Sequence, residues 1–418
     1  MANAKAGSNK TVSIVDAAGV RQVFTAFLRL GLTSFGGPVA HLGYFRDEFV
    51  GRRRWLDEES YAHIVALSQF LPGPASSQVG IIIGFERAGA LGSVAAWCGF
   101  TLPSAIALVI FAFGVHAIAN AGASSWIHGL LVASVAVVAL AVASMGASLA
   151  PDRSRRTLAI GVAIGALCAP ASGQTQLALI VVGALYGRWL LSDSRLGVVT
   201  PAGAAARMRR LGGGDPRIAL ASSVAFISLV IGLPIAERFL TAGPFIAFAK
   251  FFEVGGLVFG GGHVVLPLLR AQVVGPAWIS DTSFLAGYGA AQAVPGPLFA
   301  FAAYLGAAMD QGPVHGVSGA ALCLVAIFLP SFLLVAAILP FWDRVRSNAA
   351  AAAALRGINA AVVGLLLAAL YNPIWINAIR STGDVAIAFG ALLALAVWRA
   401  PPWSVVLGCS LVAGLFEH

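Results

Sequence analysis

The chain has 418 residues, of which 59% are hydrophobic and only 10% are charged, and its mean hydropathy is +0.88. A soluble protein carries roughly 25% charged residues, so this composition excludes a soluble globular domain and indicates a protein that lies in a lipid bilayer. The formal net charge of +9 is compatible with nucleic-acid binding, but basic loops in a membrane protein usually encode its orientation, and we expect no nucleic-acid partner.

The chain opens with a polar segment, residues 1–20, which lacks the apolar core of a signal peptide and is expected to be cytoplasmic. A first membrane repeat is predicted over 21–191. It begins with two pairs of short apolar helices, over 22–35 and 38–50 and over 57–71 and 75–87. A helix over 22–35 is about 20 Å long and cannot cross a bilayer core of roughly 30 Å. Each pair is therefore predicted to enter the membrane and return; the alternative is that the short helices are halves of broken spanning helices.

Four further apolar helices complete the first repeat, near 89–116, 125–149, 157–170 and 174–190. Residues 192–217 are rich in Arg, Gly, Pro and Ser, which predicts a flexible cytoplasmic linker. One additional membrane helix is predicted over 218–242, and a second membrane repeat over 243–418.

The two repeats share a pair of helix-breaking motifs. Phe35-Gly36-Gly37 recurs as Phe259-Gly260-Gly261, and Pro72-Gly73-Pro74 recurs as Pro295-Gly296-Pro297. A third match, Leu102-Pro103-Ser104 with Leu329-Pro330-Ser331, follows downstream. Because the matches keep their order at a nearly constant offset, we interpret the halves as homologous. Duplicated Gly and Pro breaks inside an apolar chain indicate the binding site of a transporter.

Basic residues are distributed unequally between the repeats. Arg52–Arg54 lie between the two motifs of the first repeat, whereas the matching stretch 274–277 carries no charge. The arginines of 153–156 likewise oppose a segment that has only Arg380 and Asp384. If basic loops are cytoplasmic, the repeats lie in opposite orientations, and the additional helix before the second repeat inverts it. The predicted fold class is an all-α membrane protein, an inverted-topology repeat with broken or re-entrant helices.

Each break exposes backbone groups that cost several kcal/mol in hydrocarbon unless they line a polar cavity. A helix that restarts after the break directs its N–H groups and its positive dipole end toward it, and glycine lets a ligand approach the backbone. Four such N-termini predict a site near the membrane midplane for a small anion. The candidate substrate-binding residues lie at or beside the breaks: Ser34, Phe35, Gly36, Gly37, Pro38, His41, Gln69, Pro72, Gly73, Pro74, Ser76, Ser77, Phe259, Gly260, Gly261, Gly262, His263, Gln292, Pro295, Gly296 and Pro297.

Side chains near the breaks carry less specific signals. Serine and glutamine can donate to an oxyanion, but a lone Ser in an apolar helix more often bonds its own i−4 carbonyl. His41 and His263 are candidates for binding substrate or for carrying a coupling proton. Arg29 and Glu253 occupy matching positions and are candidates for an electrostatic or coupling role, although Arg29 can also snorkel to the surface. The four cysteines have no paired spacing, so we expect no metal site and no cofactor.

Together these motifs resemble the chromate ion transporter family. In the first repeat the resemblance is carried by Gly31-Leu-Thr-Ser-Phe-Gly-Gly-Pro38, Trp55-Leu-Asp57 and Gln69-Phe-Leu-Pro-Gly-Pro74, and in the second by Phe259-Gly-Gly-Gly-His263 and Gln292-Ala-Val-Pro-Gly-Pro297. It implies a multi-pass protein of the bacterial inner membrane that exports chromate, with sulfate as the natural look-alike. Nucleotide-binding and hydrolase signatures are absent, which argues against an enzyme. An oxyanion channel and a sulfate uptake transporter of the same fold remain alternatives, and homodimerisation stays open.

Overall fold

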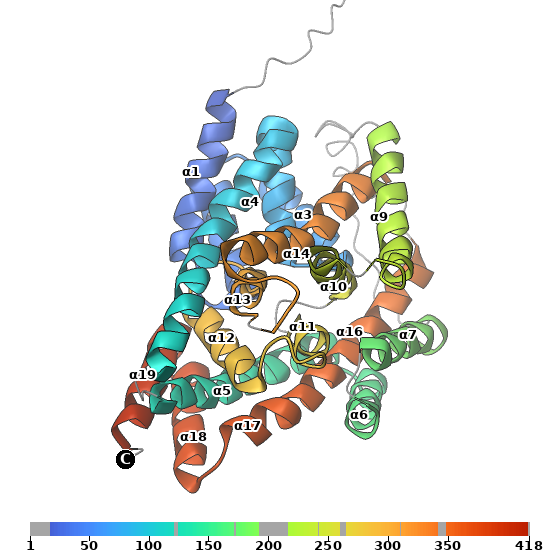
Figure 1. The fold of residues 1–418 in the computed structure, drawn as a ribbon. Coiled ribbons are helices and arrows are strands. Elements are labelled where there is room, and N and C mark those ends of the chain that lie inside the picture. The colour runs from blue at the N-terminus through green and yellow to red at the C-terminus, as the bar shows by residue number, and fades with distance from the viewer. Residues whose placement is uncertain are drawn as a thin grey trace, which may run out of the picture.

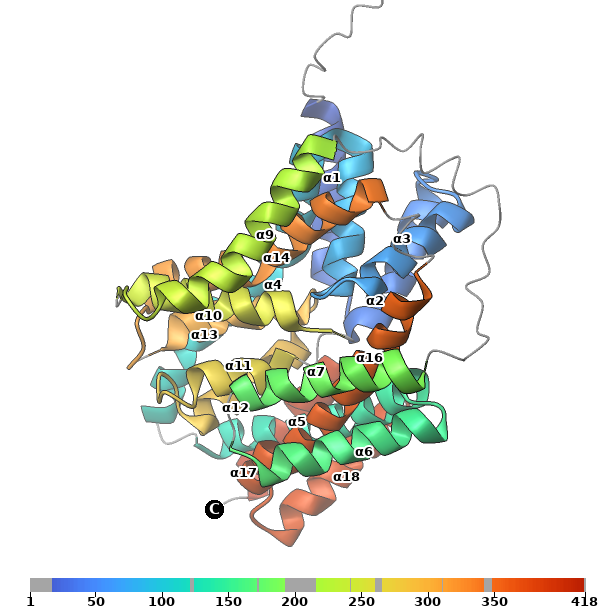
Figure 2. The ribbon, with the colours of Figure 1, turned by 90° about the vertical axis from the view of Figure 1, so that its right-hand side faces the viewer.

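The computed structural model describes residues 17–120, 124–170, 173–191, 216–240, 242–259, 265–309, 311–341 and 348–416. Within these ranges the chain is helical and contains no strand (Figures 1 and 2), which confirms the predicted all-α class. The predicted N-terminal segment, apart from its last four residues, and almost all of the predicted linker lie outside these ranges.

The helices of the first repeat end where the sequence places Gly and Pro. After α1 (Ala17–Thr33), α2 (Gly37–Arg46) continues into the π-helical turn η1 (Asp47–Arg52). α3 (Glu58–Phe70) leads to α4 (Ala75–Asn120), which non-helical dihedral angles at Ala88 and Gly89 divide into a short and a long segment. α5 (Ser124–Leu149), α6 (Arg153–Cys168) and α7 (Gly173–Leu190) complete the repeat.

The second half begins with α9 (Pro216–Ala236), whose apolar side chains are mostly exposed, as expected for a helix that faces lipid. The remaining elements are α10 (Gly243–Leu257), α11 (Val265–Val273), α12 (Asp281–Ala293), η3 (Leu298–Ala300), α13 (Phe301–Ala308), α14 (Gly316–Ile338), η4 (Leu339–Phe341), α16 (Ala349–Ala369), η5 (Leu370–Trp375), α17 (Ile376–Ala378), α18 (Thr382–Ala396) and α19 (Pro402–Phe416). The short helices α10 to α13 alternate with breaks in the same order as α1 to α4.

Five helical stretches of the described chain are long and apolar enough to cross a membrane: Ala75–Gly114, Trp126–Leu149, Pro216–Ala236, Gly316–Phe341 and Ala349–Ala378. Their length and composition agree with a membrane protein. Whether the shorter helices enter and return stays a prediction.

The loop after the first helix pair is built in the same way in both halves. Arg46 pairs with Glu58 (Nε–Oε1 2.6 Å), and Arg270 pairs with Asp281 (Nε–Oδ1 2.7 Å). In each half the next helix is capped by a side chain that accepts a hydrogen bond from the main-chain N–H three residues later. The capping residue is Asp57 before α3 and Ser280 before α12. Arg54 and Ala277, at matching positions, both have a positive φ, of 52° and 61°. These shared details support the interpretation of the halves as homologous.

The two halves share one core. α5 packs against α18 and α19 of the second half, and α16 packs against α6 and α7 of the first. The largest buried cluster correspondingly contains side chains of α4 and α5 together with side chains of α10 to α16. The halves therefore fold as one body, in which α5 and α16 each pack against the last helix pair of the other half.

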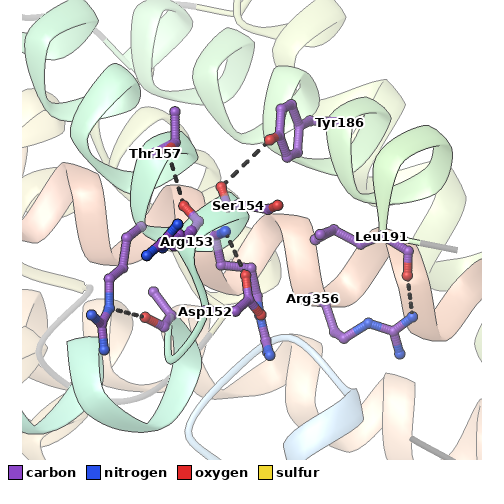
Figure 3. A network of polar contacts seen from close by, with 10 residues as sticks. Asp152, Arg153, Ser154, Thr157, Tyr186, Leu191 and Arg356 are labelled. Carbon is purple, nitrogen blue, oxygen red and sulfur yellow. Dashed lines mark hydrogen bonds and ion pairs between the residues drawn. The ribbon is translucent and has the colours of Figure 1, made fainter. Parts of the chain in front are cut away.

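The start of α6, with its arginines, lies close to Arg356 of α16 (Figure 3). Asp152 caps α6 by accepting from the main-chain N–H of Arg155, whose guanidinium pairs with the same carboxylate (Nε–Oδ2 2.5 Å). These two hydrogen bonds hold the pKa of Asp152 below its ordinary value. Close by, Arg356 of α16 donates to the carbonyl of Leu191, the last described residue before the linker (2.7 Å). The basic residues at the start of α6, Leu191 and a second-repeat arginine thus lie together.

Candidate functional site

A cavity of about 150 Å³ lies between the two halves. Its volume is many times what a single water needs. One wall is the start of α2, and the facing wall is the end of α12 with the break that follows it. The other sides are provided by α5, by the end of α18 and by the start of α19. The lining residues are Gly36, Gly37, Pro38, Val137, Leu140, Ala141, Ser144, Ala291, Gln292, Val294, Gly296, Leu298, Leu395 and Pro402.

The start of α2 owes its position to two consecutive glycines. Gly36 is in the left-handed region (φ 98°, ψ 12°) and Gly37 also has a positive φ of 77°, so side chains here would strain the backbone. No side chain caps α2. The first-turn N–H groups of a helix have no intrahelical partner, so this end of α2 brings donors and the positive dipole end to the cavity wall.

The second break of each half is tied to the first break of the other. The Gly296 N–H donates to the carbonyl of Ser34 (3.0 Å), and the Gly73 N–H donates to that of Val258 (2.6 Å). Ser34 and Val258 occupy matching positions, each one residue before the Phe of its first motif. These two glycine amides therefore donate across the interface between the halves. That the breaks also bind the anion stays a prediction. No single motif reveals the pairing of breaks across the halves.

The third repeated motif explains why these positions are glycine. A Cβ on Gly73 would lie 2.7 Å from the Ser331 hydroxyl oxygen, and a Cβ on Gly296 would lie 2.8 Å from that of Ser104. Ser104 and Ser331 close the duplicated Leu-Pro-Ser motifs, so each break packs against a serine of the opposite half. Sequence reasoning noted the duplication of these serines but did not assign them to the site.

His41 lies beside the cavity and not in its wall. Its ring is 1% exposed, with Nε2 3.2 Å from the Ser34 carbonyl and Nδ1 3.4 Å from the Ser76 hydroxyl. A carbonyl acceptor and a hydroxyl satisfy both nitrogens of a neutral imidazole. His41 therefore connects the two breaks of the first half, and neither of these two contacts brings a counter-charge for a coupling proton.

The remaining serines and glutamines differ in their surroundings. Gln78 donates to the Pro72 carbonyl (2.6 Å) and lies 3.4 Å from the Ser331 hydroxyl, which fixes the second break. The hydroxyls of Ser34 and Ser77 are buried without a hydrogen bond. Gln292 lines the cavity, and its buried amide nitrogen likewise has no hydrogen-bond partner among the described residues. Its counterpart Gln69 is exposed and lies outside the cavity wall.

Arg29 and Glu253, the candidates for an electrostatic or coupling role, do not line this cavity. Arg29 is exposed on α1, and Glu253 accepts from Gln272 of α11 (3.3 Å). Phe35 packs near Trp403, with ring centroids 6.5 Å apart, and Phe259 packs on the main core. Gly260, Gly261, Gly262 and His263 lie outside the described residues. Gly73 and Gly296 are each flanked by two prolines. None of these prolines, Pro72, Pro74, Pro295 and Pro297, lines the cavity.

No charged side chain is present among the residues that line the cavity. Polar character comes from the backbone at the start of α2, from the Gln292 amide and from the Ser144 hydroxyl, which bonds the Ala141 carbonyl (3.1 Å). Such a wall offers hydrogen-bond donors and a helix dipole, the means by which proteins bind anions without a formal counter-charge.

Comparison with known proteins identifies relatives over most of the chain. The family described as chromate transporter matches residues 21–188 and again 245–415. A chromate transport protein of Pseudomonas aeruginosa is 30% identical over 82% of this chain and 79% of its own. A probable chromate transport protein of Synechococcus elongatus is 25% identical over 87% and 86%, and a chromate transport protein of Cupriavidus metallidurans is 25% identical over 90% and 87%. No solved structure matches the chain.

Proposed function

Because the chain belongs to the chromate transporter family, we propose that it is a secondary active transporter that exports chromate across the bacterial inner membrane. The anion is held near the midplane by helix N-termini. The observation that carries this proposal is the cavity between the halves. Its wall includes the uncapped start of α2 and the Gln292 amide, whose nitrogen has no hydrogen-bond partner among the described residues.

Physical chemistry explains why such a wall suits a tetrahedral dianion. Moving a dianion out of water without compensating donors would cost tens of kcal/mol on Born estimates. Backbone amides and a glutamine amide supply donors, and the dipole of α2 supplies positive potential. The wall has no fixed cation among its described residues. The bound anion is therefore held loosely enough to be released during the transport cycle.

The arrangement of charged segments supports an inverted topology with a cytoplasmic N-terminus. The basic start of α6, Leu191 before the linker and Arg356 lie close together, as Figure 3 shows. The arginines of 153–156, Arg356 and the arginine-rich sequence that follows Leu191 supply the positive charge that marks cytoplasmic segments. The homologous halves reach this arrangement if the second is inverted by α9.

Reconstituted liposomes test the proposal. We expect the purified protein to exchange labelled chromate against unlabelled chromate with saturation, and to show counter-transport, which a channel does not. Sulfate should compete within about one order of magnitude, because amide donors recognise charge and shape and not the central atom. Chloride lacks the four oxygens, and phosphate carries protons that need acceptors, so both should compete weakly. Inhibition by chloride as strong as that by sulfate would contradict an oxyanion site built from amides.

A further inference from the structure

A buried imidazole–carboxylate pair joins the two halves away from the cavity. His128 of α5 lies with Nε2 2.8 Å from Oδ1 of Asp384, near the start of α18. Both side chains are only 4% exposed. The pair thus connects a first-half helix to a second-half helix inside an apolar part of the molecule.

The carboxylate is arranged to remain ionised. Its second oxygen, Oδ2, accepts from the main-chain N–H groups of Arg380 and Ser381 and from the Ser381 hydroxyl. These three hydrogen bonds cap the start of α18 and account for Oδ2. The other oxygen, Oδ1, faces the imidazole. His128 therefore has what His41 lacks, namely an anionic partner that stabilises the protonated ring.

Both partners belong to helices that line the cavity. α5 contributes Val137, Leu140, Ala141 and Ser144 to its wall, and α18 contributes Leu395. A change in the strength of the His128–Asp384 contact therefore affects two helices that line the cavity, α5 from the first half and α18 from the second. Ionisable groups inside a membrane protein are costly and as a rule mark ion or proton pathways.

We propose that the His128–Asp384 pair is the proton-binding site through which transport responds to the proton gradient; this inference rests on the proposed function. One proton from the solution adds to the neutral imidazole and yields an imidazolium beside the carboxylate. The pair then changes from an ion–dipole contact to an ion pair, which holds α5 more firmly against α18. Release of the proton relaxes the contact and completes the cycle.

Other titratable groups near the pair do not supply an equivalent contact. Arg380 precedes α18, and the described elements packed against α5 and α18 carry Asp281 and Tyr288 on α12, Tyr371 in η5, Cys409 on α19, Arg356 on α16, and Glu86, Arg87 and Cys98 on α4. Arg380 contributes its main chain to Asp384, and Asp281 is paired with Arg270 at the start of α12. Arg356 and Arg87 donate elsewhere, to Leu191 and Gln22. Tyr371 is 57% exposed, and Tyr288 and Cys409 are buried. The buried imidazole–carboxylate contact is thus the feature on which the proposal rests.

The test uses the full chain in liposomes and separates exchange from gradient-driven flux. The variant is His128→Gln, whose amide can still donate to Asp384, and the control is His315→Gln, an exposed histidine before α14. Chromate exchange is measured at equal pH on both sides. Chromate uptake is then measured with an imposed pH gradient, together with an enclosed pH dye.

We expect the wild type and His315→Gln to respond to the gradient at least tenfold, with a dye signal that depends on chromate. His128→Gln should retain exchange within about threefold and lose the gradient response. A retained gradient response in His128→Gln, or loss of exchange in both His128→Gln and His128→Asn, would assign the pair a structural role and overturn the inference. Wild-type exchange without any gradient response would overturn it as well. Absence of exchange by the wild type would instead remove the proposed function, and this inference with it.

Discussion

Gln69 and Gln292 show how one repeated residue can acquire two environments. Both stand three residues before the first Pro of a Pro-Gly-Pro break, yet only Gln292 lines the cavity. Its amide nitrogen is buried and has no partner among the described residues. An unpartnered buried donor is costly, so a bound anion is the natural partner in the proposed function.

We predict that Gln292→Leu raises the KM for chromate at least about tenfold, whereas Gln69→Leu changes it less than threefold. A hydrogen bond to a charged group is worth about 1.5–3 kcal/mol, and 1.4 kcal/mol corresponds to about tenfold in affinity. Initial rates of chromate uptake into liposomes at varied chromate concentration provide the measurement. Equal effects of the two substitutions would place the anion elsewhere.

A second residue-scale prediction uses two serines one turn apart on α5. Ser144 lines the cavity, whereas Ser148 is exposed and lies outside it. Ser144→Asp should reduce chromate transport at least tenfold because the new negative charge repels the anion. Ser148→Asp should leave transport near the wild-type rate. Comparable rates in the two variants, at equal amounts of folded protein, would rule out anion binding in this cavity.

At this scale the sequence could predict the breaks but not the whole wall. Gly36, Gly37 and Pro38 are recognisable because they interrupt an apolar run. Val137 and Ser144 stand in a helix that is apolar all round, so the sequence contains no signal for the face that borders the cavity. The exposed position of Arg29 was predictable, because Arg21, Thr25 and Arg29 recur at helical spacing on one polar face of α1.

At the scale of elements, the second breaks serve to join the halves. Gly73 and Gly296 have φ values of 116° and 103°, and their amides donate across the interface between the halves. The predicted helix boundaries agree with the structure to within a few residues here because Gly and Pro act locally. Which break contacts which could not be predicted, because it depends on how the halves meet.

We predict that Gly296→Ala lowers the thermal midpoint of the detergent-purified protein by several degrees and reduces its abundance. The positive φ costs about 1–3 kcal/mol for a side chain, and the added Cβ would lie 2.8 Å from the Ser104 hydroxyl. Gly51→Ala is the control, since a Cβ there meets nothing within 4 Å. Normal stability combined with lost transport would favour the alternative, in which the Gly296 amide serves the anion directly.

At the scale of the molecule, each half packs one helix against the last helix pair of the other. α16 packs against α6 and α7 of the first half, and α5 packs against α18 and α19 of the second. The duplicated motifs predicted homologous halves. They did not predict this packing between the halves, because it is made by apolar helices with similar sequences. The shared core means that the halves do not form separate domains.

The inverted topology leads to the last prediction, which concerns the two loops that carry Gly51 and Ala277. These loops have the same fold, with Arg54 and Ala277 both at positive φ, but only the first is basic. Single cysteines at Gly51 and Ala277, both exposed, would be introduced after replacement of Cys98, Cys168, Cys323 and Cys409 by alanine. An impermeant maleimide applied to intact cells should label Ala277→Cys only, and inside-out vesicles should reverse the pattern, because the basic loop remains cytoplasmic. Labelling of both cysteines from the same side would show that the homologous halves are parallel, and the anion site would then need to be rebuilt without an inversion.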